Sequence, residues 1–127
     1  MRTRPRQPGF TLIELIVVMA IIALLASLAA PRYFASLSRS REAALLQTLS
    51  VTRDSIDKFY ADTGKYPDDL ETLVTKRYLR SLPVDPLTES SATWLLVPPE
   101  DPEKGGVYDL HSGAEGTGRN GKPFREW

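Results

Sequence analysis

Residues 9–14 are Gly9-Phe10-Thr11-Leu12-Ile13-Glu14, and an apolar run follows them as far as Ala30. Glu14 is the one charged side chain between Phe10 and Ala30. A carboxylate close to lipid is costly, so a residue of this kind usually has a function and a defined partner. The run is close to the roughly 20 apolar residues that a membrane-spanning helix needs. We therefore expect residues 10–30 to form such a helix.

A short basic segment precedes this run. Arg2, Arg4 and Arg6 lie within Met1–Gly9, and basic residues beside a membrane-spanning segment favour the cytoplasmic side. The remainder of the chain is then expected outside the cytoplasm. A conventional secretory signal peptide is the alternative, with a small-residue cleavage site within Ala26–Ala30. That reading leaves Gly9-Phe10 and Glu14 without a role, because they precede the apolar core.

The leader, Gly9, Phe10-Thr11-Leu12-Ile13-Glu14 and the apolar run resemble the N-terminus of the type IV pilin superfamily. The resemblance implies that residues 1–9 are a leader, that prepilin peptidase cleaves between Gly9 and Phe10, and that methylation makes Phe10 N-methylphenylalanine. It also implies that residues 10–30 form the core of a filament, with Glu14 acting in assembly. Glu14 would neutralise the new amine of its own chain or of a neighbour. A carboxylate reaching toward lipid headgroups is the alternative for Glu14.

Later motifs are similar to the major pseudopilin, protein G, of type II secretion systems. They are Tyr66-Pro67, the segment 78–86, the segment 107–113 and Trp127. This resemblance implies a single-pass protein of the bacterial inner membrane, with residues 31–127 as a pilin-like globular domain in the periplasm. It implies a structural subunit of a filament that drives protein export. The implied partners are prepilin peptidase, identical subunits, minor pseudopilins and an inner-membrane assembly platform. A type IV pilus or competence pilin, and a membrane-anchored binding module, are the alternatives.

The patterning predicts an α+β fold, with one long helix packed on a small antiparallel sheet. Pro31 is expected to weaken or break the helix, because it cannot donate to the carbonyl of Ser27. Beyond it, apolar residues at alternating steps of four and three form one helix face. They are Leu45, Leu49, Thr52, Ile56 and Phe59.

Turn and strand signals divide the rest of the chain. Gly64 suits a left-handed helix end, and Asp68 is expected to cap a short helix. Thr93–Val97 and Val107–His111 are predicted strands, joined by a polar turn rich in proline and glycine. Phe124 and Trp127 are expected to fold back onto the sheet.

Composition excludes several functions. The chain has no cysteine, which removes disulfides and thiolate chemistry. It has 16 basic and 16 acidic residues, and the leader holds three of the arginines, so residues 10–127 are net acidic and nucleic acid is not an expected partner. His111 and Ser112 would point to opposite faces of a strand and cannot pair as base and nucleophile. We expect no enzyme activity.

A calcium site is the remaining chemical hypothesis. The resemblance to protein G implies Ca²⁺ bound in the loop after the last strand. Here the loop offers hard oxygen donors. They are Asp109, Ser112, Glu115 and Asn120. The chain departs from the family at Gly113-Ala114-Glu115-Gly116 and lacks a later aspartate pair. Apart from this ion, no cofactor is expected.

Overall fold

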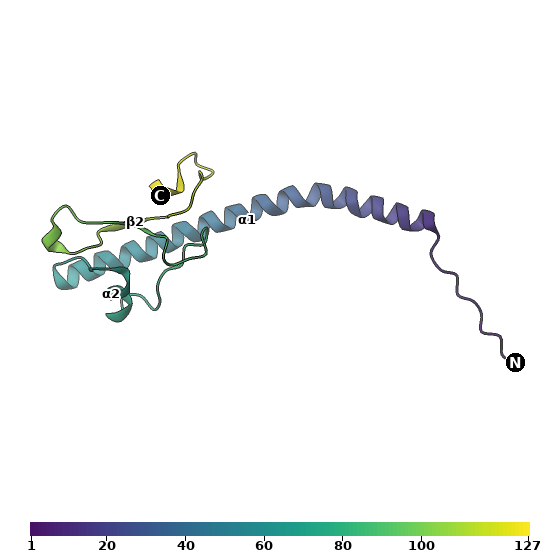
Figure 1. The fold of residues 1–127 in the computed structure, drawn as a ribbon, viewed down its shortest axis with the longest axis horizontal. Helices are drawn as coiled ribbons and strands as arrows, with labels where there is room; N and C mark the ends of the chain where they lie inside the picture. The colour runs from purple at the N-terminus through teal and green to yellow at the C-terminus, as the bar shows by residue number, and fades with distance from the viewer. The chain divides into compact units, whose positions relative to one another are not determined.

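The computed structural model describes all of residues 1–127. The chain forms two compact units, Met1–Ser38 and Arg39–Trp127. Helix α1 (Leu12–Thr63) contributes to both and runs through Pro31 without ending there, so the predicted helix break is not seen in this structure (Figure 1). A proline removes one backbone hydrogen bond, while the turns on either side of it keep theirs.

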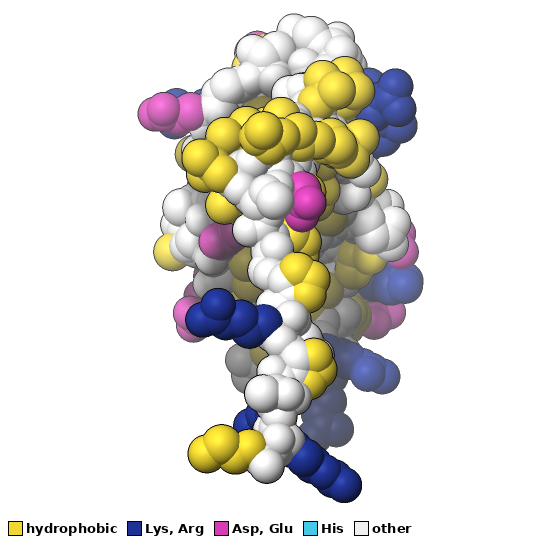
Figure 2. Space-filling model, turned by 90° about the vertical axis from the view of Figure 1, so that its right-hand side faces the viewer, with side chains coloured by type: hydrophobic (Ala, Val, Ile, Leu, Met, Phe, Trp, Pro, Cys, Tyr) yellow, Lys and Arg dark blue, Asp and Glu magenta, His cyan; other side chains and the backbone are white.

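The first unit consists of an extended segment and an exposed apolar helix. No residue before Leu12 is helical. Helix α1 is long and apolar enough to span a membrane, and none of its most apolar part is buried. Figure 2 shows hydrophobic side chains in yellow on the exposed surface at this end of the molecule and dark-blue basic side chains below them.

The second unit is built on the later part of α1. The predicted stripe is confirmed, because all five of its residues are buried. Gly64 ends the helix with a φ of 76°, and its N–H donates to the carbonyl of Tyr60 at 2.8 Å. Non-glycine residues disfavour this left-handed conformation. The rest of the core joins the stripe from the following segments through Leu70, Leu73, Trp94, Val107 and Leu110.

A short helix and a two-stranded sheet complete the second unit. They are α2 (Leu70–Thr75), β1 (Leu95–Val97) and β2 (Asp109–His111). The strands are antiparallel, and Leu96 lies opposite Leu110. Two short 3₁₀ helices, η1 (Pro102–Lys104) and η2 (Phe124–Glu126), lie in the loop between the strands and in the C-terminal tail. The predicted α+β architecture is confirmed.

Three local predictions need correction. Asp69, not Asp68, caps α2, because its side chain accepts from the N–H of Thr72 at 2.7 Å. Strand β1 begins two residues later than predicted, since Trp94 turns inward and its indole N–H donates to the carbonyl of Pro83 at 2.8 Å. Strand β2 begins at Asp109, because the N–H of Val107 donates to the carbonyl of Pro67 instead of pairing with β1.

Candidate functional site

The predicted cleavage site lies outside regular structure. Gly9 and Phe10 precede the first turn of α1, and Phe10 is 89% exposed. No atom beyond the neighbouring residues lies within 4 Å of the position where Gly9 would carry a Cβ. The peptide bond between Gly9 and Phe10 is therefore open to an enzyme that approaches along the leader.

Thr11 and Glu14 define the start of α1. The N–H of Glu14 donates to Oγ1 of Thr11 at 3.2 Å, which satisfies one of the free donors in the first turn. The Thr11 to Glu14 spacing also suits a capping box, in which the glutamate reaches back to the N-terminal backbone. In this structure the Glu14 carboxylate makes neither a hydrogen bond nor an ion pair. It is exposed and available to a cation.

The helix around Glu14 has a surface that requires a partner. Leu12 and Ile13 are 75% and 73% exposed, and Leu24 and Leu28 are 62% and 65% exposed. Contiguous apolar surface of this kind on a protein marks a membrane or protein interaction site. Glu14 is thus a lone carboxylate beside a face that only lipid or other apolar side chains satisfy.

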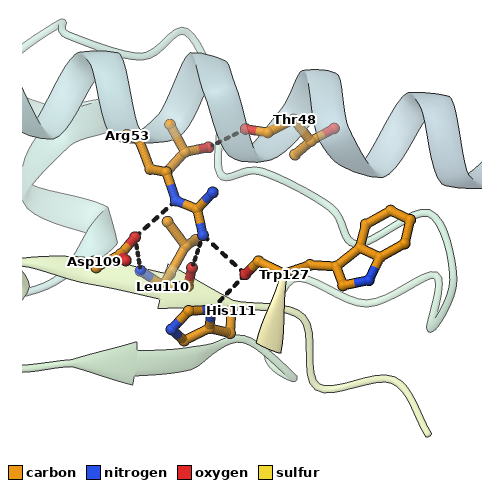
Figure 3. A network of polar contacts seen from close by, with 7 residues as sticks. Thr48, Arg53, Asp109, Leu110, His111 and Trp127 are labelled. Carbon is orange, nitrogen blue, oxygen red and sulfur yellow. Dashed lines mark hydrogen bonds and ion pairs between the residues drawn. The ribbon is translucent and has the colours of Figure 1, made fainter. Parts of the chain in front are cut away.

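Arg53 connects three segments of the second unit (Figure 3). Its Nε donates to Oδ1 of Asp109 at 2.7 Å, and its Nη2 donates to the carbonyls of Leu110 and Trp127, each at 2.9 Å. The ring nitrogen Nδ1 of His111 also contacts the Trp127 carbonyl. No sequence motif indicated a role for Arg53. A planar guanidinium with several donors is well suited to linking three segments by hydrogen bonds.

The four proposed calcium donors do not form a calcium site as arranged here. Oδ1 of Asp109 accepts from Arg53, and Oγ of Ser112 donates to Oδ2 of Asp85 at 2.5 Å. Glu115 is exposed, and the Asn120 side-chain oxygen accepts from a backbone N–H at 3.0 Å. A cation competes poorly for a carboxylate that already binds a guanidinium. Calcium binding stays a prediction, and an ion that used Oδ1 of Asp109 would have to displace Arg53.

Sequence reasoning included Asp85 only within the segment 78–86 and assigned it no role. The residue is fully buried, and its carboxylate accepts from Ser112 and from the N–H of Leu87 at 2.9 Å. Ser112 therefore points into the protein, while His111 points toward Trp127 on the other side of the strand. The predicted separation of His111 and Ser112 is confirmed. The flanking Pro83 and Pro86 were the available signal of a constrained loop.

Comparisons with known proteins converge on one family. Residues 4–30 match the family model of the prokaryotic N-terminal methylation motif. The chain is 30% identical to type II secretion system core protein G of Escherichia coli K12, over 88% of this chain and 84% of that protein. It is 29% identical to the core protein G of Pseudomonas aeruginosa PAO1, over 98% and 97% of the two chains.

A pilus protein is also among the relatives. The chain is 34% identical to fimbrial protein EcpC of Eikenella corrodens over 61% of its own length, and it spans about half, 54%, of that relative. No solved structure matches the chain. The methylation motif, the exposed apolar helix and the match along nearly the whole of the core protein G chains agree: this chain belongs to the type II secretion system core protein G family, the type IV pilin-like pseudopilins.

Proposed function

We propose that this chain is the structural subunit of a periplasmic filament that drives protein export by type II secretion. The observation that carries the proposal is the N-terminal segment itself, where an accessible Gly9–Phe10 bond precedes an unpaired Glu14 on the exposed apolar part of α1. Such a helix is satisfied by lipid in the monomer and by other copies in a filament. The subunit is anchored in the inner membrane, with its head in the periplasm.

Processing and assembly follow from the same residues. Prepilin peptidase removes residues 1–9 and methylates Phe10, which leaves a cationic amine. Glu14 lies four residues on and neutralises that amine or the amine of a neighbouring copy. An unpaired charge in an apolar environment costs several kcal/mol, so the pairing sets the axial register of the subunits. Minor pseudopilins and an inner-membrane assembly platform complete the machinery.

The first experiment measures processing. The intact mass and the N-terminal peptide of the membrane-bound protein are compared in cells with and without prepilin peptidase. We expect a chain that begins at methylated Phe10 only when the peptidase is present. A chain that retains Met1–Gly9, or one cut near Ala30, contradicts the proposal.

The second experiment separates processing from assembly. Glu14→Ala and Glu14→Gln are expected to leave cleavage and membrane insertion intact while abolishing filaments, because the amine then has no counter-charge. Glu71→Ala is the matched control, since Glu71 is an exposed carboxylate outside α1 and is not among the proposed calcium donors. Normal filament assembly by both Glu14 variants would contradict the role proposed for Glu14.

A type IV pilus subunit is the second candidate, favoured by the similarity to a fimbrial protein. Deleting the gene distinguishes the two functions. Loss of secreted proteins from the medium supports the export filament, whereas loss of surface fibres with normal secretion supports the pilus.

A further inference from the structure

A groove of about 540 Å³ lies beside the loop between β1 and β2. We call it the tyrosine–acid groove, and its lining includes Tyr66, Tyr108, Pro98, Glu100, Asp101 and Lys104. Figure 1 shows this loop, which contains η1, at one end of the second unit. The groove takes no part in the cleavage or in the Glu14 pairing proposed above.

Aromatic rings form one wall of the groove. Tyr66 stacks on Tyr60 with ring centroids 4.4 Å apart, and it meets Tyr108 edge to face at 5.3 Å. Tyr108 is 52% exposed, which is high for a large aromatic side chain. A tyrosine face attracts a cation, most often the guanidinium of an arginine. The wall is therefore suited to a basic side chain from another molecule.

Charge in the groove favours the same ligand. Glu100 and Asp101 are exposed and form no ion pair, and Lys104 is the single basic residue among the lining residues. Burial raises the pKa of Tyr66, and the neighbouring phenols and Asp57 raise it further, whereas Lys104 lowers it. Two acids against one base leave the lining of the groove with a net negative charge.

The complementary surface lies elsewhere on the same unit. A second groove of about 300 Å³ lies between α1 and the C-terminal tail, and Arg39 and Arg119 both line it. Both arginines are exposed and neither forms an ion pair. Glu42 is the one acid in the lining, and its carboxylate accepts the backbone N–H of Arg119 at 3.2 Å. Leu46 supplies 55% exposed apolar surface beside them.

We propose that Arg39 and Arg119 of one copy dock into the tyrosine–acid groove of a second copy. The proposal rests on the proposed filament function and names one contact within it. Two different complementary patches on one chain give a head-to-tail contact, and repetition of that contact produces an open filament. Tyrosine and arginine are also among the residues enriched at binding hot spots.

The contact has a geometric consequence. Arg39 and Tyr60 both belong to α1, and Tyr60 stacks on the groove residue Tyr66. At 1.5 Å per residue their positions are separated by roughly 32 Å along the helix axis. Parallel copies joined by this contact are therefore offset by about that distance.

Disulfide trapping tests the contact directly, because the chain contains no cysteine. Full-length chains carrying both Ala43→Cys and Pro98→Cys place one thiol beside each patch. In cells that assemble filaments, mild oxidation is expected to give a ladder of linked multimers. A mixture of the two single variants is expected to stop at dimers. Ala43→Cys with Ser81→Cys is the control, because Ser81 lies outside both grooves, and it should give no ladder.

Charge reversal then tests the chemistry. Arg39→Glu is expected to reduce the linked fraction at least tenfold, and Glu100→Arg in the same chain is expected to restore most of it. Arg41→Glu is the matched control, since residues two apart on a helix point in different directions. Filaments that form without the ladder, or a ladder that Arg39→Glu leaves unchanged, overturn this contact while the proposed function stands. Failure of the unmodified, processed chain to form any filament overturns both.

Discussion

Arg53 shows how a single side chain determines the packing of the second unit. It joins α1 to β2 and to the C-terminal residue through hydrogen bonds of 2.7–2.9 Å. The guanidinium and Asp109 are 36% and 29% exposed, so water screens part of their attraction. The pair stabilises the fold mainly through its geometry, because one planar guanidinium donates to a carboxylate and to two carbonyls at once.

Arg53→Ala is expected to lower the free energy of unfolding of the detergent-solubilised full chain by about 1–2 kcal/mol. Three hydrogen bonds are lost and the Asp109 carboxylate is left without its cation. Arg53→Lys should recover only part of the loss, since an ammonium lacks the planar fork. Thermal or urea unfolding followed by circular dichroism measures both.

Lys58→Ala provides the comparison for Arg53. Lys58 pairs with Asp54 at 3.5 Å on the helix surface, and both side chains are 70% exposed. Pairs of this kind contribute at most about 0.5 kcal/mol. Equal losses from Arg53→Ala and Lys58→Ala would mean that the network in Figure 3 adds nothing beyond surface charge.

At the scale of one element, helix α2 also depends on a single side chain. Asp69 caps it by accepting from both the N–H and the hydroxyl of Thr72, each at 2.7 Å. The Thr72 hydroxyl contributes most to holding the pKa of Asp69 below its ordinary value of 3.8, and the backbone N–H adds to it. The ionised carboxylate is therefore the form that the folded state prefers.

The sign of the pH effect follows from that lowered pKa. The stabilisation is fully present above the ordinary value of 3.8 and is lost as the pH falls through the lower value of the folded state. Asp69→Asn should therefore lower the unfolding temperature at neutral pH and lose less stability on acidification. Unfolding temperatures from neutral pH to below 3.8 measure this difference. Asp68→Asn serves as the control, and an equal effect from it would show that the cap is not the cause.

The helices and strands were easier to predict from the sequence than the contacts between them. The buried stripe of α1 and the glycine end at Gly64 were predictable because helix periodicity is a local property. The Arg53 network was not, since its partners lie more than fifty residues away. Gly113 is similar: a Cβ there would lie 1.9 Å from the carbonyl oxygen of Thr93, and only the folded chain reveals that approach.

The residues of the candidate site were also predictable from the sequence only in part. Gly9, Phe10 and Glu14 were predictable, because cleavage and charge neutralisation depend on a short contiguous motif. The proposed calcium donors depended on loop geometry, and the sequence did not reveal that Asp109 and Ser112 bind other residues of the protein. The tyrosine–acid groove was also not predicted, since Tyr60, Tyr66 and Tyr108 meet only in the folded unit.

At the scale of the whole molecule, the buried core and the exposed apolar surface lie in different parts of the chain. Every buried apolar side chain lies at or after Leu45, and the apolar residues before it are exposed. Folding of the second unit therefore draws none of its core from residues 1–38. The apolar surface of the first unit remains free for lipid or for other copies.

This separation predicts that a fragment of residues 39–127 folds without the anchor. It should be soluble without detergent and should unfold cooperatively within a few degrees of the full chain, because no core residue has been removed. Differential scanning calorimetry and size-exclusion chromatography measure both properties. A fragment of residues 50–127 is the control: it lacks Leu45 and Leu49, which are 0% and 1% exposed in the full chain, and should fail to fold. If the longer fragment aggregates like the shorter one, the head depends on the membrane segment for its stability, and the division at Arg39 does not describe how the chain folds.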